Sequence, residues 1–206
     1  MDFSQSRYSS YVSTVLFTKK GQGVTVTGHH HNLNFWGMGR SAVVFKIKGE
    51  DRVIKIFYPP FEKIALEEQR NYEKVKGNHF YPNIYESGAN YLVMDFIDGK
   101  TFFQCLAEGI PLKKNYVEQV DNALQAARRS GLNPSDIHLH NLIVTKEEHV
   151  RIIDIARFSQ KKQCSQWDDL KSSYERHYHR FYFPKKVPKW IMNAIAKLYR
   201  LLKSAK

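Results

Sequence analysis

Three oxygen-bearing side chains stand at fixed points around a short apolar hairpin. Asp136 and Asn141 lie five residues apart, directly before the strand-like residues 142–144, and Asp154 follows the next apolar run, 150–153. This spacing brings all three side chains to one end of the hairpin, although each one alone is more often a turn or cap residue. Mg²⁺ prefers oxygen ligands, usually one or two carboxylates or amides together with phosphates and water. The sequence therefore predicts a magnesium site that leaves one Asp free to act as a base.

This order of residues resembles the catalytic loop and the metal-binding motif of the eukaryotic-like protein kinase superfamily, H-R-D-x-x-x-x-N and D-F-G. The resemblance implies that Asp136 is the catalytic base and that Asn141 and Asp154 are the two Mg²⁺ ligands. It also implies ATP as the phosphoryl donor, so ATP and Mg²⁺ are the expected cofactors.

A kinase also needs a loop that covers the phosphates of the nucleotide. Residues 37–44 match the pattern G-x-G-x-x-G-x-V, with Ala42 in place of the third glycine. Glycine lets the backbone approach phosphate oxygens, although a plain hairpin turn needs the same freedom. By the resemblance, Gly37, Gly39, Ser41 and Ala42 would line the nucleotide.

The next strand-like segment carries Lys55 among apolar residues, in a run that resembles V-A-I-K. The resemblance implies that Lys55 binds the α- and β-phosphates and pairs with a glutamate on the following helix; otherwise it is an edge-strand lysine that points into water. Glu68 is the expected partner, because Tyr72 and Val75 then lie one and two turns later on the face that meets the strands. Glu67 is the rival candidate.

Residues 91–99 resemble the strand that leads into the hinge between the two lobes, with Met94 at the gatekeeper position. By that match the Asp95 carbonyl and the Ile97 amide would pair with the adenine edge, and Asp98 would reach the ribose. A buried strand that ends in an Asp-Gly turn is equally compatible with these residues.

Hydrophobic periodicity predicts a β-rich part followed by an α-rich part, with the boundary near residue 98. Strands are expected at 11–15 and 24–26 around a turn at 21–23, and at 34–47, 53–57, 84–85, 91–96, 142–144 and 150–153. Helices are expected at 62–76, 102–107, 117–129, about 166–181 and 189–203. With the resemblance, this order predicts an α+β fold of the two-lobed protein kinase type in a single domain, 1–206. Its N-lobe would be 1–97, with an extra N-terminal hairpin, and its reduced C-lobe 98–206, with basic C-terminal helices.

The resemblance runs from about residue 33 to 156, and only 52 residues follow Asp154. The chain is similar to the short serine/threonine kinases of Bacillus-type bacteria and, more distantly, to the Rio group. Pro134 and Ser135 replace the His and Arg before the catalytic Asp, and no A-P-E motif follows. His138 stands where Ser/Thr kinases usually have Lys, and the resulting D-x-H is also found in small-molecule phosphotransferases.

These observations lead to an expected function and two alternatives. We expect a serine/threonine-protein kinase that transfers the γ-phosphoryl group of Mg-ATP to a hydroxyl of a protein substrate. His138 and the missing peptide platform keep open a small-molecule kinase that acts on a sugar or an aminoglycoside-like alcohol. The third reading is a nucleotide-binding pseudokinase that serves as a scaffold.

The charge of the chain is concentrated at its C-terminal end. Lys and Arg total 32 against 20 Asp and Glu, and residues 157–206 hold 13 basic and 3 acidic residues, a net charge of +10. Such a region can attract a polyanion, although a solvated basic surface is the plainer interpretation. No apolar run is long enough to span a membrane and no secretory signal is recognisable, so a cytoplasmic location is expected.

Other candidate sites have plain structural interpretations. Cys105 and Cys164 are far apart and lack ligand spacing, so neither a disulfide framework nor a zinc site is expected. Residues 29–31, three histidines, are expected to form a polar turn. The last helix has apolar residues on one side and basic ones elsewhere, and packing against the lobe is favoured over binding to an anionic surface.

Overall fold

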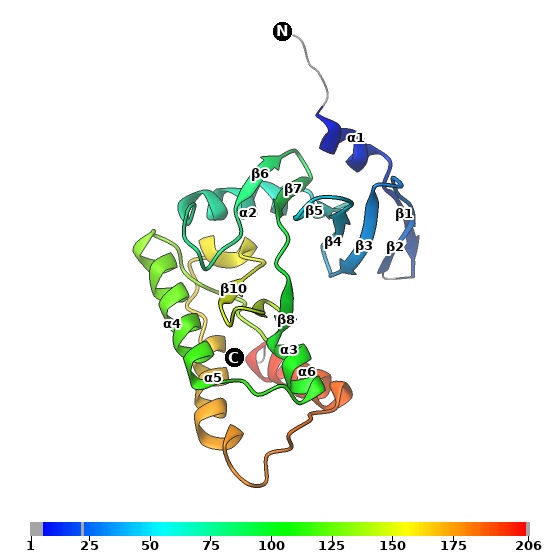
Figure 1. Cartoon of the computed structure of the whole chain (residues 1–206). Coiled ribbons are helices and arrows are strands. Elements are labelled where there is room, and N and C mark those ends of the chain that lie inside the picture. Colours follow the sequence, from blue (N-terminus) through cyan, green and yellow to red (C-terminus); the bar gives the residue numbers. More distant parts are fainter. Residues whose placement is uncertain (1–5, 22, 205–206) are drawn as a thin grey trace.

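The structure, a computed structural model, describes residues 6–21 and 23–204, so the turn residue Gln22 lies outside the described residues. A β-rich N-lobe and a helix-rich C-lobe lie one above the other in Figure 1. The chain passes between them through residues 96–98, which join strand β7 to strand β8. Among the described residues, none of the helices combines the length and the hydropathy needed to cross a bilayer.

The N-lobe is built on a five-stranded antiparallel sheet with the strand order β3-β4-β5-β7-β6. Its strands are β3 Leu33–Met38, β4 Ala42–Ile47, β5 Arg52–Phe57, β6 Ile84–Ser87 and β7 Tyr91–Asp95. The central strand β5 is buried along almost its whole length because both faces of the sheet are covered. Ile54 and Ile56 belong to one hydrophobic cluster, and Val53 and Phe57 belong to another. Side chains alternate along a strand, so Lys55 shares the face of Val53 and Phe57.

Helix α2, Lys63–Lys74, covers the face of the sheet that carries Lys55. Its buried residues include Ala65, Glu68 and Tyr72, which recur every three or four positions and so form one helical stripe. Ala65 and Tyr72 pack in the same cluster as Val53. The apolar stripe therefore fixes the rotation of the helix and turns Glu68 toward the sheet.

The N-terminal residues cover the opposite face of the sheet with a helix and a hairpin. Helix α1, Arg7–Ser13, begins at Ser6, whose hydroxyl caps the amide of Tyr8. Strands β1, Leu16–Lys20, and β2, Gly23–Gly28, pair as a separate antiparallel hairpin. The predicted hairpin around the turn at 21–23 is present. The predicted strand at 11–15 is wrong, because residues 11–13 are helical. The Ser6 hydroxyl caps the first turn of this helix, and Tyr8 packs onto the sheet.

The C-lobe combines helices with a three-stranded sheet in the order β10-β9-β8. Its elements are β8 Gly99–Thr101, α3 Phe102–Glu108, α4 Lys114–Arg129, β9 Leu142–Thr145, β10 Val150–Ile152, the 3₁₀ turn η1 Ala156–Ser159, α5 Gln166–Ser173, η2 Tyr174–Tyr178 and α6 Lys189–Ser204. The predicted helix at 166–181 is α-helical only to Ser173. It continues as the π-helical turn η2, where Tyr174 donates a hydrogen bond to the Leu112 carbonyl and Tyr178 accepts one from the Leu112 amide.

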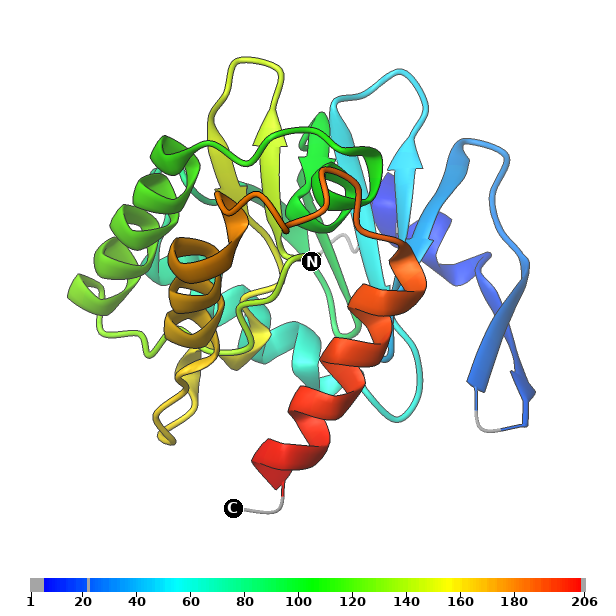
Figure 2. The same ribbon diagram turned by 90° about the horizontal axis from the view of Figure 1, so that it is seen from below.

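One hydrophobic cluster runs through both lobes and so holds the hairpin in place. It joins Phe57 and Met94 of the N-lobe to Leu142 and Ile152, the apolar residues of β9 and β10. Helix α4 contacts the back of this hairpin, as Figure 2 shows from below. The end of the hairpin that carries Asn141 and Asp154 thereby lies against the N-lobe.

Candidate active site

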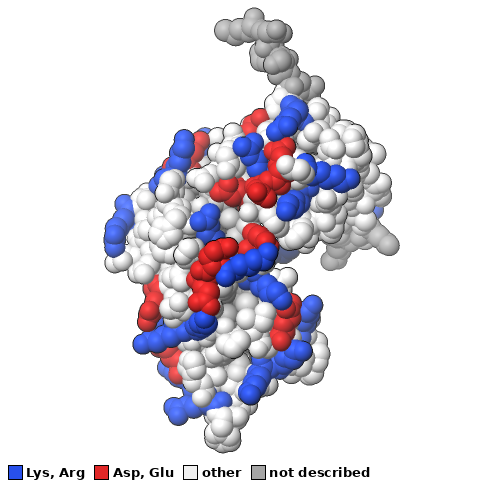
Figure 3. Space-filling view, viewed as in Figure 1, with Lys and Arg blue, Asp and Glu red and all other residues white. Residues whose placement is uncertain are grey.

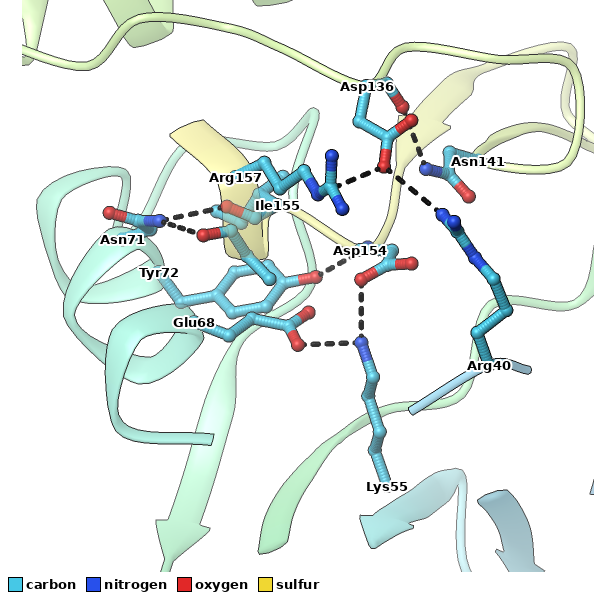
Figure 4. A network of polar contacts seen from close by, with 11 residues as sticks. Arg40, Lys55, Glu68, Asn71, Tyr72, Asp136, Asn141, Asp154, Ile155 and Arg157 are labelled. Carbon is cyan, nitrogen blue, oxygen red and sulfur yellow. Dashed lines mark hydrogen bonds and ion pairs between the residues drawn. The ribbon is translucent and has the colours of Figure 1, made fainter. Parts of the chain in front are cut away.

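Lys55, Glu68 and Asp154 converge from three elements of two lobes (Figure 4). The Lys55 Nζ lies 2.6 Å from Glu68 Oε2 and 2.8 Å from Asp154 Oδ1. Glu68 is fully buried and Lys55 nearly so, while about half of the Asp154 side chain stays exposed (49%). Because Glu67 is exposed, the structure places Glu68 and not its rival against the lysine.

The electrostatics of this trio follow from burial and close opposite charges. Burial lowers the pKa of Lys55, but the carboxylates of Glu68 and Asp154 outweigh it and raise that pKa above its ordinary value. Burial raises the pKa of Glu68 to about 7, with Lys55 acting in the opposite direction. The Lys55 ammonium lowers the pKa of Asp154 against the effect of burial. Asp154 is thus held ionised at the mouth of the site, and Lys55 is held protonated.

Helix α2 also fixes the backbone around Asp154. The Asn71 amide nitrogen donates hydrogen bonds to the carbonyls of Ile155 (2.9 Å) and Ala156 (3.2 Å), and the Asp154 amide donates to the Tyr72 hydroxyl (3.2 Å). Asp154 has φ +59°, a left-handed conformation that non-glycine residues adopt rarely, so these bonds stabilise a strained turn. Sequence reasoning missed this role of Asn71, although an Asn among the apolar positions of a helix was a usable signal.

Asp136 and Asn141 are held together by the loop between them. The Asn141 Nδ2 donates to the Asp136 carbonyl (3.1 Å), and the Asn141 amide donates to the His138 carbonyl (2.9 Å). Asp136 also has a left-handed backbone, with φ +60°. The Ile153 amide donates to the Asn141 carbonyl (2.9 Å), which puts Asn141 beside the strand end that carries Asp154. The three residues predicted from the hairpin are therefore brought to one end of it.

Two arginines that the sequence did not indicate flank the Asp136 carboxylate. Arg40 Nη2 from the N-lobe lies 3.9 Å from Asp136 Oδ2, and Arg157 Nε from the η1 turn lies 3.5 Å from the same oxygen. Both guanidinium groups are largely exposed, whereas the Asp136 side chain is only 29% exposed. The sequence signal for these two residues was weak: Arg40 is a basic residue inside the glycine pattern, and Arg157 is the third residue after Asp154.

The glycine pattern contains the turn between β3 and β4 and the adjoining ends of both strands. The Gly39 amide donates to the Ala42 carbonyl (2.8 Å), and Tyr58 donates its hydroxyl proton to the Gly39 carbonyl (2.7 Å). The Ser41 carbonyl accepts from the Tyr58 amide (3.2 Å), and a register shift precedes Gly37 in the β3–β4 pairing. Tyr58 therefore anchors both sides of the turn to the end of β5.

The hinge candidates lie at the end of β7 and beyond it. The Asp95 side chain turns away from the site and accepts hydrogen bonds from Tyr85 (2.5 Å) and Asn83 (2.8 and 3.0 Å). Asp98 forms an exposed ion pair with Lys146 (2.7 Å), whose hydrogen bond lowers the pKa of Asp98. Ile97 lies between them in the segment that connects the lobes. Only the backbone of Asp95 is then available for an adenine edge, as the resemblance implied.

His138 lies in the loop between Asp136 and Asn141. Within the described residues, its buried Nδ1 has no hydrogen-bond partner. Burial lowers the pKa of His138, while the charges of Asp136 and Asp154 raise it and those of Arg40 and Arg200 lower it further. The lowered pKa favours the neutral form of this imidazole inside the loop.

The remaining predictions concern metals outside this site. Within the described residues, His, Cys, Asp and Glu side chains form no cluster of three or more that could hold a metal ion. His30 stacks on Tyr11, and its Nδ1 accepts a hydrogen bond from the Asn32 amide, so the three histidines form a turn, as predicted. Cys105 and Cys164 are both free thiols.

Comparison with known proteins gives a consistent result. The family model described as "RIO domain" matches residues 51–192. The chain is 45% identical over 189 residues to "Putative serine/threonine-protein kinase YrzF" of Bacillus subtilis (strain 168), covering 91% of this chain and 88% of the relative. It is 28% identical over 135 residues to "Probable serine/threonine-protein kinase CA_C1728" of Clostridium acetobutylicum, covering 57% of this chain and 20% of that one.

Solved structures show the same fold. A crystal structure of WbdD superposes with a TM-score of 0.52 and 23% identity, over 73% of this chain and 37% of that one. A co-crystal structure of WbdD with the kinase inhibitor LY294002 gives a TM-score of 0.50 and 21% identity, over 77% and 38%. The chain thus spans little more than a third of those chains. The predicted two-lobed, protein-kinase-like fold is confirmed.

Proposed function

The chain belongs to the RIO domain family, and from this premise we propose that it is an ATP-dependent serine/threonine-protein kinase of the cytoplasm. The observation that carries the proposal is the contact of Lys55 with both Glu68 and Asp154, at 2.6 and 2.8 Å. A buried ammonium held by a helix carboxylate and aimed at a second, half-exposed carboxylate is the arrangement that positions nucleotide phosphates in kinases.

The proposed reaction is transfer of the γ-phosphoryl group to a hydroxyl. Asp136 accepts the proton of the hydroxyl as its oxygen bonds to the γ-phosphorus, and the bond from that phosphorus to the β–γ bridging oxygen breaks, so ADP leaves. The hydrogen bond from Asn141 to the Asp136 carbonyl supports this role, because it fixes the backbone that carries the base. Positioning and neutralisation of charge supply most of the catalysis in such a reaction.

The residues at the hairpin end fit a divalent cation. Asp154 offers a half-exposed carboxylate, and the Asn141 amide nitrogen is engaged by the Asp136 carbonyl, so its amide oxygen is the atom left for a ligand. These are hard oxygen donors of the kind that bind Mg²⁺. In the proposal Asn141 and Asp154 hold Mg²⁺, which supplies neutralisation of phosphate charge when it is bound.

Further cationic groups surround the position of the phosphates. Lys55 would bind the α- and β-phosphates, and the turn at Gly37, Gly39, Ser41 and Ala42 would cover them. Arg40 and Arg157 pair with the Asp136 carboxylate through largely exposed guanidinium groups. In the proposal, each guanidinium group would leave the carboxylate and bind a phosphate oxygen of the nucleotide instead. Guanidinium groups bind phosphate oxygens with strong charge-assisted hydrogen bonds.

The proposal is tested by incubating the full chain with γ-labelled ATP, Mg²⁺ and a cytosolic extract. The matched control is Asp136→Asn, because Asn removes the base and tolerates the left-handed backbone at this position. We expect label on discrete proteins that the Asp136→Asn protein fails to transfer. Equal labelling by both proteins would overturn the role of Asp136. If no protein of the extract became labelled, the choice of a protein as the acceptor would be overturned.

A small-molecule acceptor is the second candidate, because the segment that would dock a peptide is short. The η1 turn ends at Ser159 and helix α5 begins at Gln166, so six residues separate them. His138, beside the base, is also the residue found in small-molecule phosphotransferases. Label that appears only in the small-molecule fraction of the extract would favour this candidate over a protein kinase.

A further inference from the structure

Helix α6 exposes an apolar surface instead of burying it. Trp190 is 72% exposed, Ile195 61%, Leu198 58% and Leu202 62%. In Figure 2 the helix runs along the outside of the molecule, and its C-terminal turns extend past the neighbouring elements. The expected packing of this helix on the lobe is wrong for most of its length.

Two contacts on one side of α6 attach it to the rest of the protein. Met192 is buried with Val187 and Phe103 in a small hydrophobic cluster. Seven residues later, on the same side of the helix, Tyr199 donates a hydrogen bond to Asp169 of α5 (2.7 Å). These two contacts fix the rotation of the helix and direct the apolar residues away from the lobe.

The exposed apolar residues form one continuous face. Ile195, Leu198 and Leu202 follow each other at spacings of three and four, and Leu198 lies two turns after Trp190. Two more exposed aromatic residues, Phe181 (100%) and Tyr182 (57%), precede the helix in the connecting segment. An exposed apolar surface of this kind in a folded protein marks an interaction site.

The charged residues of α6 and of the segment that leads into it are all basic. After Glu175 the chain contains nine Lys and Arg residues and no Asp or Glu. Lys189, Lys197 and Arg200 lie on the helix itself and are exposed. On the face of the molecule seen in Figure 3, by contrast, basic and acidic side chains are interleaved. The last part of the chain can therefore attract an anionic partner.

We propose that α6 is a docking surface for an anionic lipid membrane, lying in the plane of the headgroups with its apolar face inserted. An apolar face with Trp and Leu bordered by Lys and Arg is the composition of helices that lie in a membrane interface. A nucleic acid backbone would contact the basic side chains but would leave the four apolar side chains exposed to water. A second copy of the chain would bring two surfaces of like charge together. An anionic membrane can contact both parts of the surface: its acyl chains would cover the apolar face, and its headgroups would pair with the Lys and Arg side chains.

The test is cosedimentation of the full chain with vesicles of phosphatidylcholine alone or with one-third phosphatidylglycerol, at low and high salt. We expect binding only to the anionic vesicles, weakened by salt. Leu198→Glu should weaken it at least tenfold, because one fully inserted Leu contributes that much. The double variant Lys189→Gln/Lys197→Gln should weaken it about 30-fold, since each Lys near an anionic surface contributes about 1 kcal/mol, a factor of roughly five.

Matched controls come from helix α2 and the residues directly after it, which offer the same residue types in exposed positions. Leu66→Glu and the double variant Lys74→Gln/Lys76→Gln should bind vesicles as the wild type does. The Asp136→Asn protein should also bind unchanged, so failure of the membrane proposal is distinguishable from failure of the proposed activity. Because the substituted side chains of the α6 variants and of their matched controls are exposed, the melting temperature of these variants should equal that of the wild type.

Three results would overturn the proposal. The first is equal binding of Leu198→Glu and wild type to anionic vesicles, since the apolar face would then play no part. The second is a dimer in light scattering that Leu198→Glu converts to a monomer, since the occupant would then be a second copy. The third is binding of DNA, but not of vesicles, that survives Leu198→Glu.

Discussion

Replacing Glu68 by Gln removes the one carboxylate of the site that is completely buried. Its Oε2 accepts from Lys55, while its Oε1 has no hydrogen-bond partner within the described residues. Burial raises the pKa of Glu68 from 4.5 to about 7. In the unfolded chain this carboxyl returns to its ordinary pKa, so the stability of the folded protein must depend on pH through this group.

The sign and size of the effect follow from that shift. A folded-state pKa above the unfolded value contributes stability that is fully present below pH 4.5 and is lost as pH rises through about 7. At about 1.36 kcal/mol per pKa unit, titration between pH 5 and pH 8 removes roughly 2 to 3 kcal/mol from the wild type. Gln is neutral at every pH, so the Glu68→Gln protein does not show this loss. The free energy of unfolding of the variant, relative to the wild type, should therefore rise by that amount between the two pH values.

Urea unfolding of the wild type and the variant at both pH values measures this difference. Glu67→Gln is the matched control, because Glu67 is the neighbouring residue on the same helix and is exposed. Its free energy of unfolding should follow that of the wild type at both pH values. A difference between Glu68→Gln and the wild type that is constant with pH would refute the argument that burial holds the pKa of Glu68 high.

Three further substitutions test how the site is positioned. Asn71→Ala leaves two backbone carbonyls without their donor and should lower the free energy of unfolding by about 1–3 kcal/mol in urea titrations. Tyr58→Phe loses the hydrogen bond to the Gly39 carbonyl, so the KM for ATP should rise while stability falls by about 1 kcal/mol; an unchanged KM would contradict a role of this turn in nucleotide binding. Gly99→Ala would place a Cβ 2.3 Å from a carbonyl oxygen of β9 and should lower the melting temperature, whereas Gly37→Ala meets nothing within 4 Å and should not.

The sequence predicted those parts of the site that depend on local patterns. Lys55 was indicated by the resemblance of its apolar strand to V-A-I-K, and Glu68 by a helical stripe of apolar residues whose rotation then fixes its direction. Asp136, Asn141 and Asp154 were indicated by their positions around a hairpin. In each case, one element with a clear period determines where the side chain points.

The features that escaped prediction depend on contacts between distant segments. Arg40 and Arg157 meet at Asp136 only because the two lobes are stacked, and no local pattern encodes that contact. Tyr11 was expected in a strand because three alternating residues cannot be distinguished from one turn of helix. The apolar face of α6 was expected to be buried, because amphipathic helices for a protein core and for a lipid surface share the same periodicity.

Pro134 and Ser135 stand before Asp136, where protein kinases usually have His and Arg. Ser135 is buried and donates its hydroxyl proton to the Asn133 carbonyl, so it brings no charge to Asp136. The positive charge next to the Asp136 carboxylate comes from Arg40 of the N-lobe and from Arg157 in the segment after Asp154. Ion pairs between such exposed groups are worth about 1 kcal/mol or less, so the phosphates of a nucleotide would displace the carboxylate easily. Since Arg40 belongs to the turn between β3 and β4, a nucleotide that took over this arginine would release Asp136 and hold the turn against the phosphates in the same step.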